Sequence, residues 1–452
     1  MSGSANFKQY LWPIAMTLLG LLACYNVIPR EIQAVNEHIL GFPDTDIAGH
    51  RLRPYLLGLL CLLPAIGAWI YRFSSCLDRY MARQFLGSFT LCMGALLVVM
   101  ILTDLQNNMS DFNEASSTIG VMMSYYGIFI PAMFVFILPY VLLLSLLYCL
   151  GKMSRHQEIV AMIQTGRGVF RVVMPLFLTG VFSSVICLIF NYHWGPWAEG
   201  NKDIIIDIAK DGEAERARSV LYRDSKSRRV WLVGSFPYRF EQTGVLRNVT
   251  VHSFNEGKHP TTKLEADEAQ WSRKTKSWTF TNPQLIDLQA VPVPVKIKTE
   301  DRITRDWHET PWQIVKPGLD QSHLGIPELN SWLKAHEGVQ WANRLPYITQ
   351  WHYRIAQPVI CLVTILLAAP LGIVFSRRGL GGGVSIALFL SAGMLFSSSF
   401  FLTFGEAGHM PPILAAWATN IVFALVALYL FNRRITGRPI YDSVKKLFPG
   451  GS

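Results

Sequence analysis

The feature that most constrains this chain is a series of apolar runs, each close to the length that crosses a lipid bilayer. A helix needs about 20 consecutive apolar residues to span the hydrocarbon core. The chain has 452 residues, of which 51% are hydrophobic and only 16% are charged, a composition too apolar for an ordinary soluble protein. The sequence therefore predicts a polytopic α-helical membrane protein. We predict about eight spans, at residues 11–27, 55–71, 85–103, 126–150, 169–192, 357–375, 384–404 and 410–431.

The first run, residues 11–27, is predicted to remain in the protein as a membrane anchor. A signal peptide has a small-residue cleavage site after its apolar segment, and this run lacks one. A second apolar run also follows it, at residues 55–71. We therefore expect two membrane helices ahead of the other spans.

Lysine and arginine residues in the short loops predict the orientation of the spans, because cationic residues near span ends are held on the cytoplasmic side. Alternate loops carry these residues, whereas residues 104–125 and the turn at 405–409 have none. The loop at 28–54 is an exception, since its arginines are balanced by acids. Both termini are therefore predicted to be cytoplasmic. The basic residues behind this prediction are Arg72, Arg79, Arg83, Lys152, Arg155, Arg167, Arg171, Arg377, Arg378, Arg433, Arg434, Arg438, Lys445 and Lys446.

The long hydrophilic insert at about 193–350 is predicted to lie on the outer side. Its segments are short, rich in valine, threonine and aromatic residues, and broken by glycine, proline, asparagine and aspartate. This pattern is typical of a small all-β domain, either a sandwich or a jelly roll. Acids and bases nearly cancel within the insert, so most of the net charge of +10 belongs to the cytoplasmic loops. That distribution favours anionic lipid headgroups, and not nucleic acid, as a partner.

The polar stretch 151–171 separates two long apolar runs and is the best indication of function. Ile159, Met162 and Ile163 recur within it at helical spacing. We predict a short amphipathic helix at about 152–165 that lies at the membrane surface or in the groove of a partner protein. The alternative is a solvated loop whose charges only follow the topology rules. The polar residues of the stretch include Arg155, His156, Glu158 and Gln164.

The sequence predicts no catalytic, metal or cofactor site. All seven cysteines lie in or beside apolar runs, which suits small buried side chains and not a disulfide framework or a paired-cysteine metal site. The histidine–glutamate pairs at 308–309 and 336–337 do not continue into a zinc-protease motif. A glycine-rich phosphate loop that ends in lysine and serine or threonine is also missing from the sequence. Any use of nucleotide therefore requires another chain.

Four polar residues near the outer ends of spans are candidates for the border of a cavity open to the outside: Asp104, Gln106, Asn107 and Glu406. Polar groups at membrane depth are costly to bury, so they often have a function. The simpler alternative is that they mark the boundary with water.

Several short motifs follow one another in a definite order along the chain. LDRYMARQF precedes one span and DLQNN follows it, and SRHQEIVAM comes with a later Gly166. Asn191 and Pro196 flank the exit of a further span, and WHYRIAQPVICLV, SRRG and GHMPPILAAWATN follow the predicted β domain. In this combination the chain resembles the LptF/LptG (YjgP/YjgQ) permease family over about residues 77–434.

The resemblance implies the transmembrane subunit of an ATP-binding-cassette exporter, with six spans and a jelly-roll domain. Such a subunit lifts lipopolysaccharide, or a related lipid, out of the bacterial inner membrane toward a periplasmic bridge protein. It implies two further partners, a separate cytoplasmic ATPase and a second copy of the chain or a related permease, and no cofactor. The contact with the ATPase would be made by Arg155, Glu158, Ile159, Met162 and Ile163, with Glu158 at the position of the family's glutamate.

These features divide the chain into predicted parts, in which an extra membrane region precedes the family region. The predicted boundaries are 1–76 for the extra two-helix region, 77–192 for the first permease half, 193–325 for the periplasmic β-jellyroll domain, 326–434 for the second permease half with its leading helix, and 435–452 for a cytoplasmic tail.

An alternative from another class is a membrane scaffold that presents the β domain to envelope assembly partners and transports nothing. It predicts that no ATPase binds and that the stretch 151–171 tolerates mutation. A membrane-embedded enzyme is the weakest alternative, because the sequence shows no nucleophile, metal cluster or acid–base pair.

Overall fold

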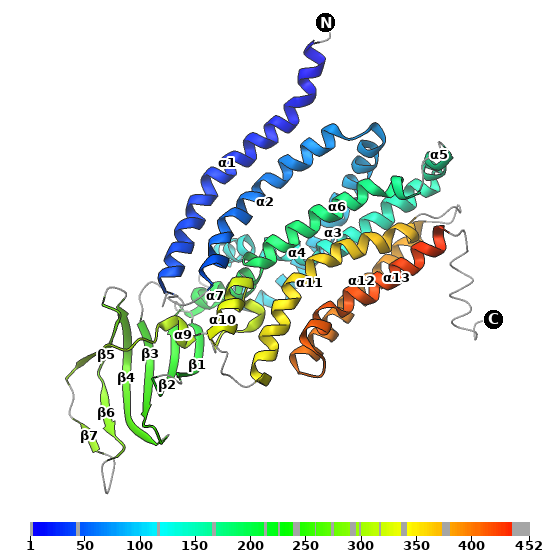
Figure 1. Ribbon diagram of the computed structural model, residues 1–452. Helices are drawn as coiled ribbons and strands as arrows, with labels where there is room; N and C mark the ends of the chain where they lie inside the picture. The colour runs from blue at the N-terminus through cyan, green and yellow to red at the C-terminus, as the bar shows by residue number, and fades with distance from the viewer. Residues whose placement is uncertain are drawn as a thin grey trace.

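The chain folds into a bundle of long helices with a β domain at one end (Figure 1). This computed structural model describes residues 3–41, 46–114, 118–164, 169–211, 215–224, 227–237, 245–257, 259–272, 275–289, 295–297, 300–315, 318–335, 341–372 and 380–435. Within these residues, eight helices are long and apolar enough to cross a membrane, and each predicted span overlaps one of them. The prediction of a polytopic helical membrane protein is confirmed. The eight are α1 (Gly3–Gly41), α2 (Ile47–Phe73), α3 (Cys76–Glu114), α4 (Thr118–Arg155), α6 (Val169–Tyr192), α11 (Trp341–Gly372), α12 (Leu380–Glu406) and α13 (Pro412–Ile435).

Several helices are longer than the apolar runs that predicted them. α3 and α4 contain 39 and 38 residues. At the usual helical rise each is about 57 Å long, nearly twice the thickness of a hydrocarbon core. α11 likewise begins at Trp341, well before the predicted start at 357. α3 and α4 therefore extend beyond their apolar runs at both ends, and α11 extends beyond its run at its N-terminal end.

α4 and α11 form the centre of the bundle. Leu142 and Leu143 of α4 and Leu367 of α11 are fully buried in one apolar core. α6 packs closely on α11, because a Cβ at Gly180 would overlap the side chain of Ile365. In contrast, α1 and α12 expose many of their large apolar side chains, as expected of helices that face lipid.

α1 and α2 form an antiparallel hairpin ahead of α3. The two helices approach closely at Gly20, where a Cβ would lie 2.9 Å from the carbonyl oxygen of Cys61. The thiol of Cys24 also lies 3.7 Å from the carbonyl oxygen of Gly58. α2 connects the hairpin to the rest of the molecule through α3, α6 and α10.

The described strands of the β domain form one antiparallel sheet of eight strands. Its order is β1-β2-β3-β4-β5-β8, with β6 pairing to β4 and β7 pairing to β6. Trp231, Phe236, Trp278 and Phe280 are fully buried in the core of the domain. The predicted all-β domain is confirmed, but the jelly roll is not, because the first five strands pair in chain order. The strands are β1 (Glu215–Asp224), β2 (Arg229–Pro237), β3 (Val245–Phe254), β4 (Pro260–Ser272), β5 (Ser277–Thr281), β6 (Gln284–Asp287), β7 (Val295–Ile297) and β8 (Arg302–Arg305).

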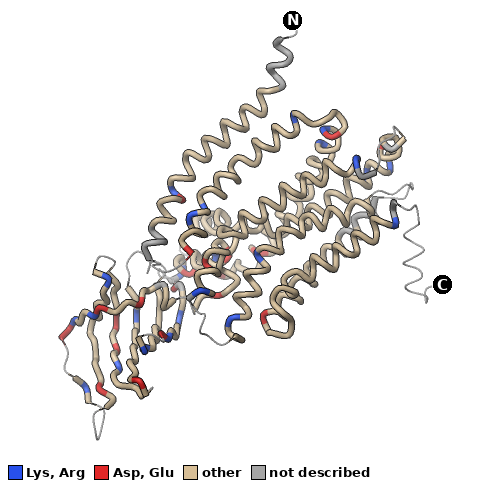
Figure 2. Tube along the Cα trace, viewed as in Figure 1, with Lys and Arg blue, Asp and Glu red and all other residues tan. Residues whose placement is uncertain are grey.

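Shorter helices connect the membrane helices and the β domain. α7 (Trp194–Asp211) leads from α6 to the sheet, while α9 (Pro311–Val315), η2 (Gln321–His323) and α10 (Ile326–Ala335) lead from the sheet back to α11. α5 (Glu158–Gln164) joins α4 and α6 at the end of the bundle opposite the β domain (Figure 1). Charged residues gather on the β domain and at its junction with the helices, and they are sparse along the middle of the bundle (Figure 2).

Candidate functional site

α5 is positioned by a tight turn at the end of α4. α4 ends at Arg155, and Gln157 has a positive φ of 58°, which redirects the chain before α5 begins at Glu158. The amide of Gln157 donates to the carbonyl oxygen of Ser154 at 3.0 Å, and the amide of Ala161 donates to that of Gln157 at 2.9 Å. The separate helix is therefore shorter than the predicted stretch 152–165, because its first residues continue α4.

The apolar side of α5 packs against the bundle. Ile159 is 1% exposed and belongs to the core around α4 and α11, and Met162 packs against the same core. Ile163 lies in α5, but its side chain is outside the described part of the chain. Ile159 thus anchors α5 to the bundle in this conformation. Its contact with a partner stays a prediction, and it requires α5 to move.

The polar side of α5 is accessible and is linked to α3. Glu158 is half-buried, and its Oε2 accepts a hydrogen bond from the hydroxyl of Tyr80 in α3 at 2.9 Å. Gln84 donates to the same hydroxyl at 3.3 Å. Arg155 and Ala161 are exposed nearby. A force on α5 would therefore reach α3 through Tyr80 and the bundle core through the apolar side of the helix.

The residues predicted to border an outer cavity lie in two separate places. Asp104 of α3 accepts hydrogen bonds from the hydroxyls of Tyr125 and Tyr126 of α4, at 3.4 and 3.2 Å. Glu406, at the end of α12, accepts one from Gln350 of α11 at 2.7 Å. A shared cavity therefore stays a prediction, since the described contacts tie each carboxylate to a different pair of helices. The remaining two residues, both exposed on α3, are Gln106 and Asn107.

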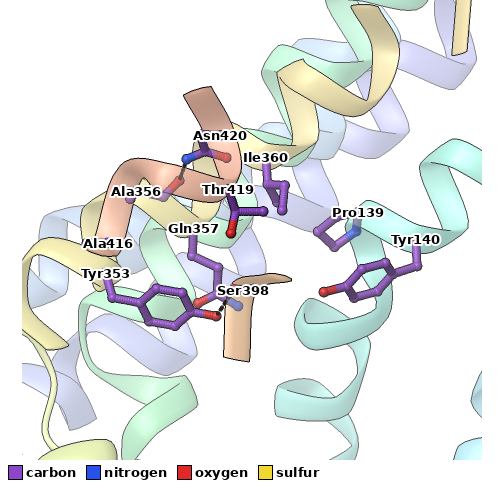
Figure 3. Close-up of a pocket in the computed structure, with 10 residues that line it drawn as sticks. All are labelled: Pro139, Tyr140, Tyr353, Ala356, Gln357, Ile360, Ser398, Ala416, Thr419 and Asn420. Carbon is purple, nitrogen blue, oxygen red and sulfur yellow. Dashed lines mark hydrogen bonds between the residues drawn. The ribbon is translucent and has the colours of Figure 1, made fainter. Parts of the chain in front are cut away.

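A small polar pocket lies between α4, α11, α12 and α13 (Figure 3). Asn420 donates to the carbonyl oxygen of Ala356 at 2.7 Å, and the hydroxyls of Tyr353 and Ser398 lie 3.3 Å apart. Gln357 and Tyr140 border the same space from α11 and α4 (Figure 3). None of the ten lining residues is charged. The pocket therefore suits a water molecule or a small neutral group, and not a phosphate.

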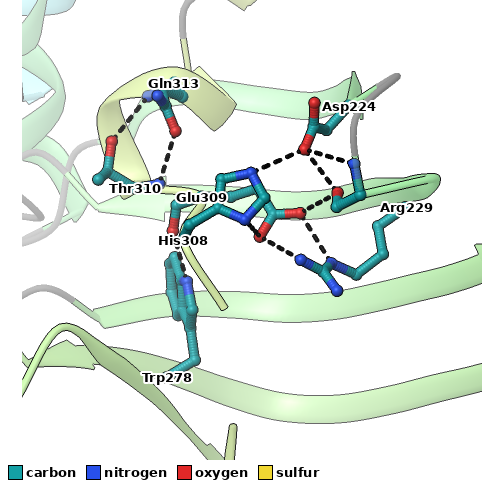
Figure 4. Close-up of polar contacts among 8 residues, drawn as sticks. Asp224, Arg229, Trp278, His308, Glu309, Thr310 and Gln313 are labelled. Carbon is teal, nitrogen blue, oxygen red and sulfur yellow. Dashed lines mark hydrogen bonds and ion pairs between the residues drawn. The ribbon is translucent and has the colours of Figure 1, made fainter. Parts of the chain in front are cut away.

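A buried ion pair fastens the β1–β2 hairpin to the segment that precedes α9 (Figure 4). Glu309 is fully buried and accepts two hydrogen bonds from the guanidinium of Arg229, at 2.8 and 3.0 Å. Ser227 donates to the same carboxylate at 2.6 Å, and the indole of Trp278 donates to the Glu309 carbonyl oxygen, also at 2.6 Å. Burial alone raises the pKa of Glu309, but the hydrogen bonds from Arg229 and Ser227 hold it below its ordinary value.

The same network contains a geometrically plausible metal site. Ligand atoms of Asp224, His308 and Glu309 all lie within 4.8 Å of one another. However, the guanidinium of Arg229 already neutralises Glu309, and His308 lies 3.0 Å from Asp224. A cation at this position would be repelled by Arg229. The network therefore has a structural role: it holds the β1–β2 hairpin against the segment that precedes α9.

The region that contains α5, the β domain and the six helices α3, α4, α6, α11, α12 and α13 corresponds to a known family. The family model for the lipopolysaccharide export system permease LptF/LptG matches residues 79–433, more than half of the chain. This chain belongs to the LptF/LptG family. The resemblance predicted from the sequence motifs is therefore confirmed.

Curated LptF/LptG relatives match a shorter part of the chain. They include the lipopolysaccharide export system permease protein LptF of Escherichia coli strain K12, of Escherichia coli O157:H7 and of Shigella flexneri, each 28% identical over 133 residues. The matched part is 29% of this chain and 36% of each relative. The alignment thus spans little more than a third of the relatives' length.

The α1–α2 hairpin lies outside the LptF/LptG region, which begins within α3. Sequence reasoning missed a charged cluster at its β-domain end. Arg53 of α2 lies 2.6 Å from Glu31 of α1, and His193, between α6 and α7, lies 2.6 Å from Glu328 of α10. His50 of α2 is 1% exposed and is electrostatically coupled to Glu328, Arg53 and His193.

One sequence signal pointed to this cluster. The stretch 28–54, predicted to be a loop but mostly helical in the structure as the end of α1 and the start of α2, carries arginines balanced by acids, which made it the exception to the orientation rule. Charges that disobey a topology rule are expected to be neutralised by partners within the protein. The partners themselves could not be predicted, because His193 and Glu328 are more than a hundred residues away in the chain.

Proposed function

We propose that this chain is the transmembrane permease subunit of an ATP-driven exporter in the bacterial inner membrane. It extracts lipopolysaccharide, or a related lipid, for transfer to the outer membrane. Its family supports this proposal, and so do its relatives, which are named as lipopolysaccharide export permeases. The observation that carries it is the position of α5, which presents Glu158 at its surface while Tyr80 and Ile159 link it to the membrane helices.

In this proposal a separate cytoplasmic ATPase docks on α5. The sequence has no phosphate-binding loop, so ATP hydrolysis belongs to another chain. Arg155 and Glu158 would provide charged contacts that set the register of docking, whereas apolar contacts would supply most of the affinity. Movement of the ATPase would displace α5 and, through its two attachments, α3 and the bundle core.

The remaining parts of the complex follow from the same proposal. Both termini and α5 lie in the cytoplasm, and the β domain lies in the periplasm, where it passes the lipid to a bridge protein. A second copy of this chain or a related permease completes the exporter. The five predicted divisions of the chain, at 1–76, 77–192, 193–325, 326–434 and 435–452, are retained as part of this proposal.

The variant Glu158→Lys tests the proposal. Affinity purification from the native membrane in mild detergent should recover a stoichiometric ATPase with the wild-type chain. Charge reversal should lower the recovered ATPase, or its lipid-stimulated turnover, by about tenfold, which corresponds to about 1.4 kcal/mol. The thermal midpoint should change by no more than about 4 °C, because Glu158 is half-buried and makes one hydrogen bond to a neutral group.

Glu256→Lys is the matched control, because Glu256 is an exposed glutamate in the β domain, far along the chain from α5. It should leave both the recovered ATPase and its turnover unchanged. If no ATPase accompanies even the wild-type chain while periplasmic partners do, the protein is a membrane scaffold and transport is excluded. If Glu158→Lys retains full lipid-stimulated turnover, Glu158 has no part in coupling.

A further inference from the structure

The β-domain end of the α1–α2 hairpin is bound to α10 by a set of polar contacts. Asp46 caps the start of α2, and its Oδ2 also accepts a hydrogen bond from the amide of Asn330 at 2.8 Å. The backbone amide of Asp46 lies 3.3 Å from the hydroxyl of Ser331. Beside them, the hydroxyl of Tyr192 at the end of α6 donates to the carbonyl oxygen of Gly49 at 2.8 Å. The hairpin is therefore joined to both α10 and α6.

Glu328 is the charged centre of this junction. Both of its carboxylate oxygens are buried, and its side chain is 15% exposed. His193 lies 2.6 Å away, while His50 and Arg53 approach from α2. Glu31 of α1 pairs in turn with Arg53. A buried carboxylate is tolerated only where cations and hydrogen-bond donors compensate its lost hydration, so the hairpin supplies part of the environment that Glu328 requires.

α10 is also bound to α11. The ring of Trp332 stacks on that of Tyr347 with centroids 3.5 Å apart. The indole of Trp351 donates to the side-chain oxygen of Asn330 at 2.7 Å. α10 is thus held between α2 and α11, and Asn330 contacts both.

The segment that precedes α10 continues the connection to the β domain. A Cβ at Gly318 would lie 2.5 Å from the side chain of Val220 in β1. Further along, Arg354 of α11 donates to the carbonyl oxygen of Ser322, and Tyr347 donates to that of Leu319 at 3.1 Å. A displacement of α10 would therefore act on a segment in contact with the first strand of the sheet.

We propose that the α1–α2 hairpin is an intramolecular brace that fixes α10 and thereby sets the position of the β domain over the membrane helices, with Glu328 as the positioning residue. This role is independent of the transported lipid and of any ATPase. The hairpin lies outside the family region, whereas Tyr192, His193, Glu328 and Asn330 lie within it. The brace is therefore an added module that acts on residues of the common core.

The brace can be tested in the full-length protein with two spin labels. One label is placed on the exposed native Cys76 at the start of α3, and the other on β1 through Leu221→Cys, an exposed position. Cys24 and Cys61, which are partly buried, are replaced by alanine in all samples. The distance distribution reports the position of the β domain relative to the core. Hydrogen exchange of residues 326–335 reports the local order of α10.

Glu328→Gln removes the charge and keeps the shape of the side chain. The brace predicts that the label-to-label distribution becomes about twofold wider and that amides of α10 exchange about tenfold faster. Glu328→Asp retains the charge. It should therefore keep both the width of the distance distribution and the exchange rates of α10 close to those of the wild-type protein. Glu256→Gln is the matched control, because it makes the same change at a glutamate of the β domain whose side chain is 88% exposed. It should change neither signal.

A second variant approaches the same junction from the hairpin. Asp46→Ala leaves Glu328 intact and removes the contact with Asn330, so it should also widen the distribution. It serves as the test if Glu328→Gln does not fold. Faster exchange in α10 with an unchanged distance distribution would overturn the brace, since α10 would then be ordered locally without positioning the β domain. Unchanged exchange and distance in both variants would overturn it as well.

Discussion

α5 and α10 are both short helices that lead into a membrane helix, and each carries a glutamate in its first turn. Their surroundings differ. Glu158 of α5 is half-buried and receives a hydrogen bond from one neutral hydroxyl. Glu328 of α10 is enclosed by His193, His50 and Arg53. A carboxylate left at the surface can still bind a partner, whereas one enclosed by an arginine and two imidazoles of its own chain has its charge already compensated.

The largest expected difference between the two glutamates is the loss of stability when each is replaced by alanine, with Glu328→Ala losing far more. Removing one member of a buried charge cluster leaves its partners uncompensated, which costs about 3–5 kcal/mol of unfolding free energy. Glu158→Ala should cost less than about 1 kcal/mol, because its pairing is exposed and neutral. Thermal unfolding in mild detergent, followed by near-ultraviolet circular dichroism, measures both. Equal losses in the two variants would contradict the distinction between an internal and an external charge.

Gly325→Ala should give the next largest effect. A Cβ at this position would overlap the carbonyl oxygen of Tyr192 and lie 2.9 Å from the Cα of His193. Both neighbours are backbone atoms, so the segment before α10 must move, at a cost of about 1–3 kcal/mol. Gly127→Ala in α4 is the matched control, since nothing lies within 4 Å of a Cβ there. Thermal midpoints of the two variants should separate clearly, and similar midpoints would show that the junction is loosely packed.

The pH dependence of stability should test whether Glu328 is ionised in the folded protein. Burial raises the pKa of Glu328, but its pairing with His193 and the nearby His50 and Arg53 lower it well below the ordinary value of 4.5. A carboxyl with a lowered folded-state pKa stabilises the protein above pH 4.5, and this contribution is lost as the pH falls below that value. Between pH 7 and pH 4 this loss is about 1 kcal/mol for the wild-type protein. Glu328→Gln lacks it but leaves His193 and His50 without their counter-charge, so the two pH profiles should differ.

Glu309 keeps its own lowered pKa in this experiment, so the variant retains part of the acid sensitivity. Unfolding midpoints measured at several pH values in the same detergent give the result. An identical pH profile for Glu328→Gln and the wild-type protein would mean that Glu328 is not ionised in the folded state.

Tyr80→Phe should give the smallest effect. It removes the hydroxyl that donates to Glu158 and keeps the ring. The loss of unfolding free energy should be at most about 1 kcal/mol, because both side chains reach solvent. Coupling to an ATPase should weaken less than in Glu158→Lys, since the charge remains. A loss of coupling as large as that of Glu158→Lys would show that the link to α3, and not the charge, transmits the movement.

Much of the membrane architecture could be predicted from residues alone. The apolar runs predict eight spans because the bilayer excludes unpaired backbone groups and charges, which leaves a long apolar helix as the local solution. The motifs from LDRYMARQF to GHMPPILAAWATN also indicated the family correctly. The order of the strands could not be predicted from the sequence, because pairing in a sheet joins distant segments whose alternating patterns resemble one another.

The candidate site was predicted only in outline. The sequence indicated an amphipathic helix with Glu158 on its polar side, and the structure has one at Glu158–Gln164. Helical spacing groups Ile159 and Met162 on one face but does not reveal what that face contacts. In the folded chain it contacts the bundle core, so the apolar residues predicted to meet a partner first meet their own protein.

By itself, the sequence determined which segments cross the membrane, where the β domain is inserted and which family the chain belongs to. These properties depend on local composition and motif order. Only the tertiary structure decided that Glu31, Arg53, His193 and Glu328 share one buried cluster, and that the hairpin binds α10. The physical reason is that the burial of a charge and its compensation depend on which residues are close in space, and these residues come from distant parts of the chain.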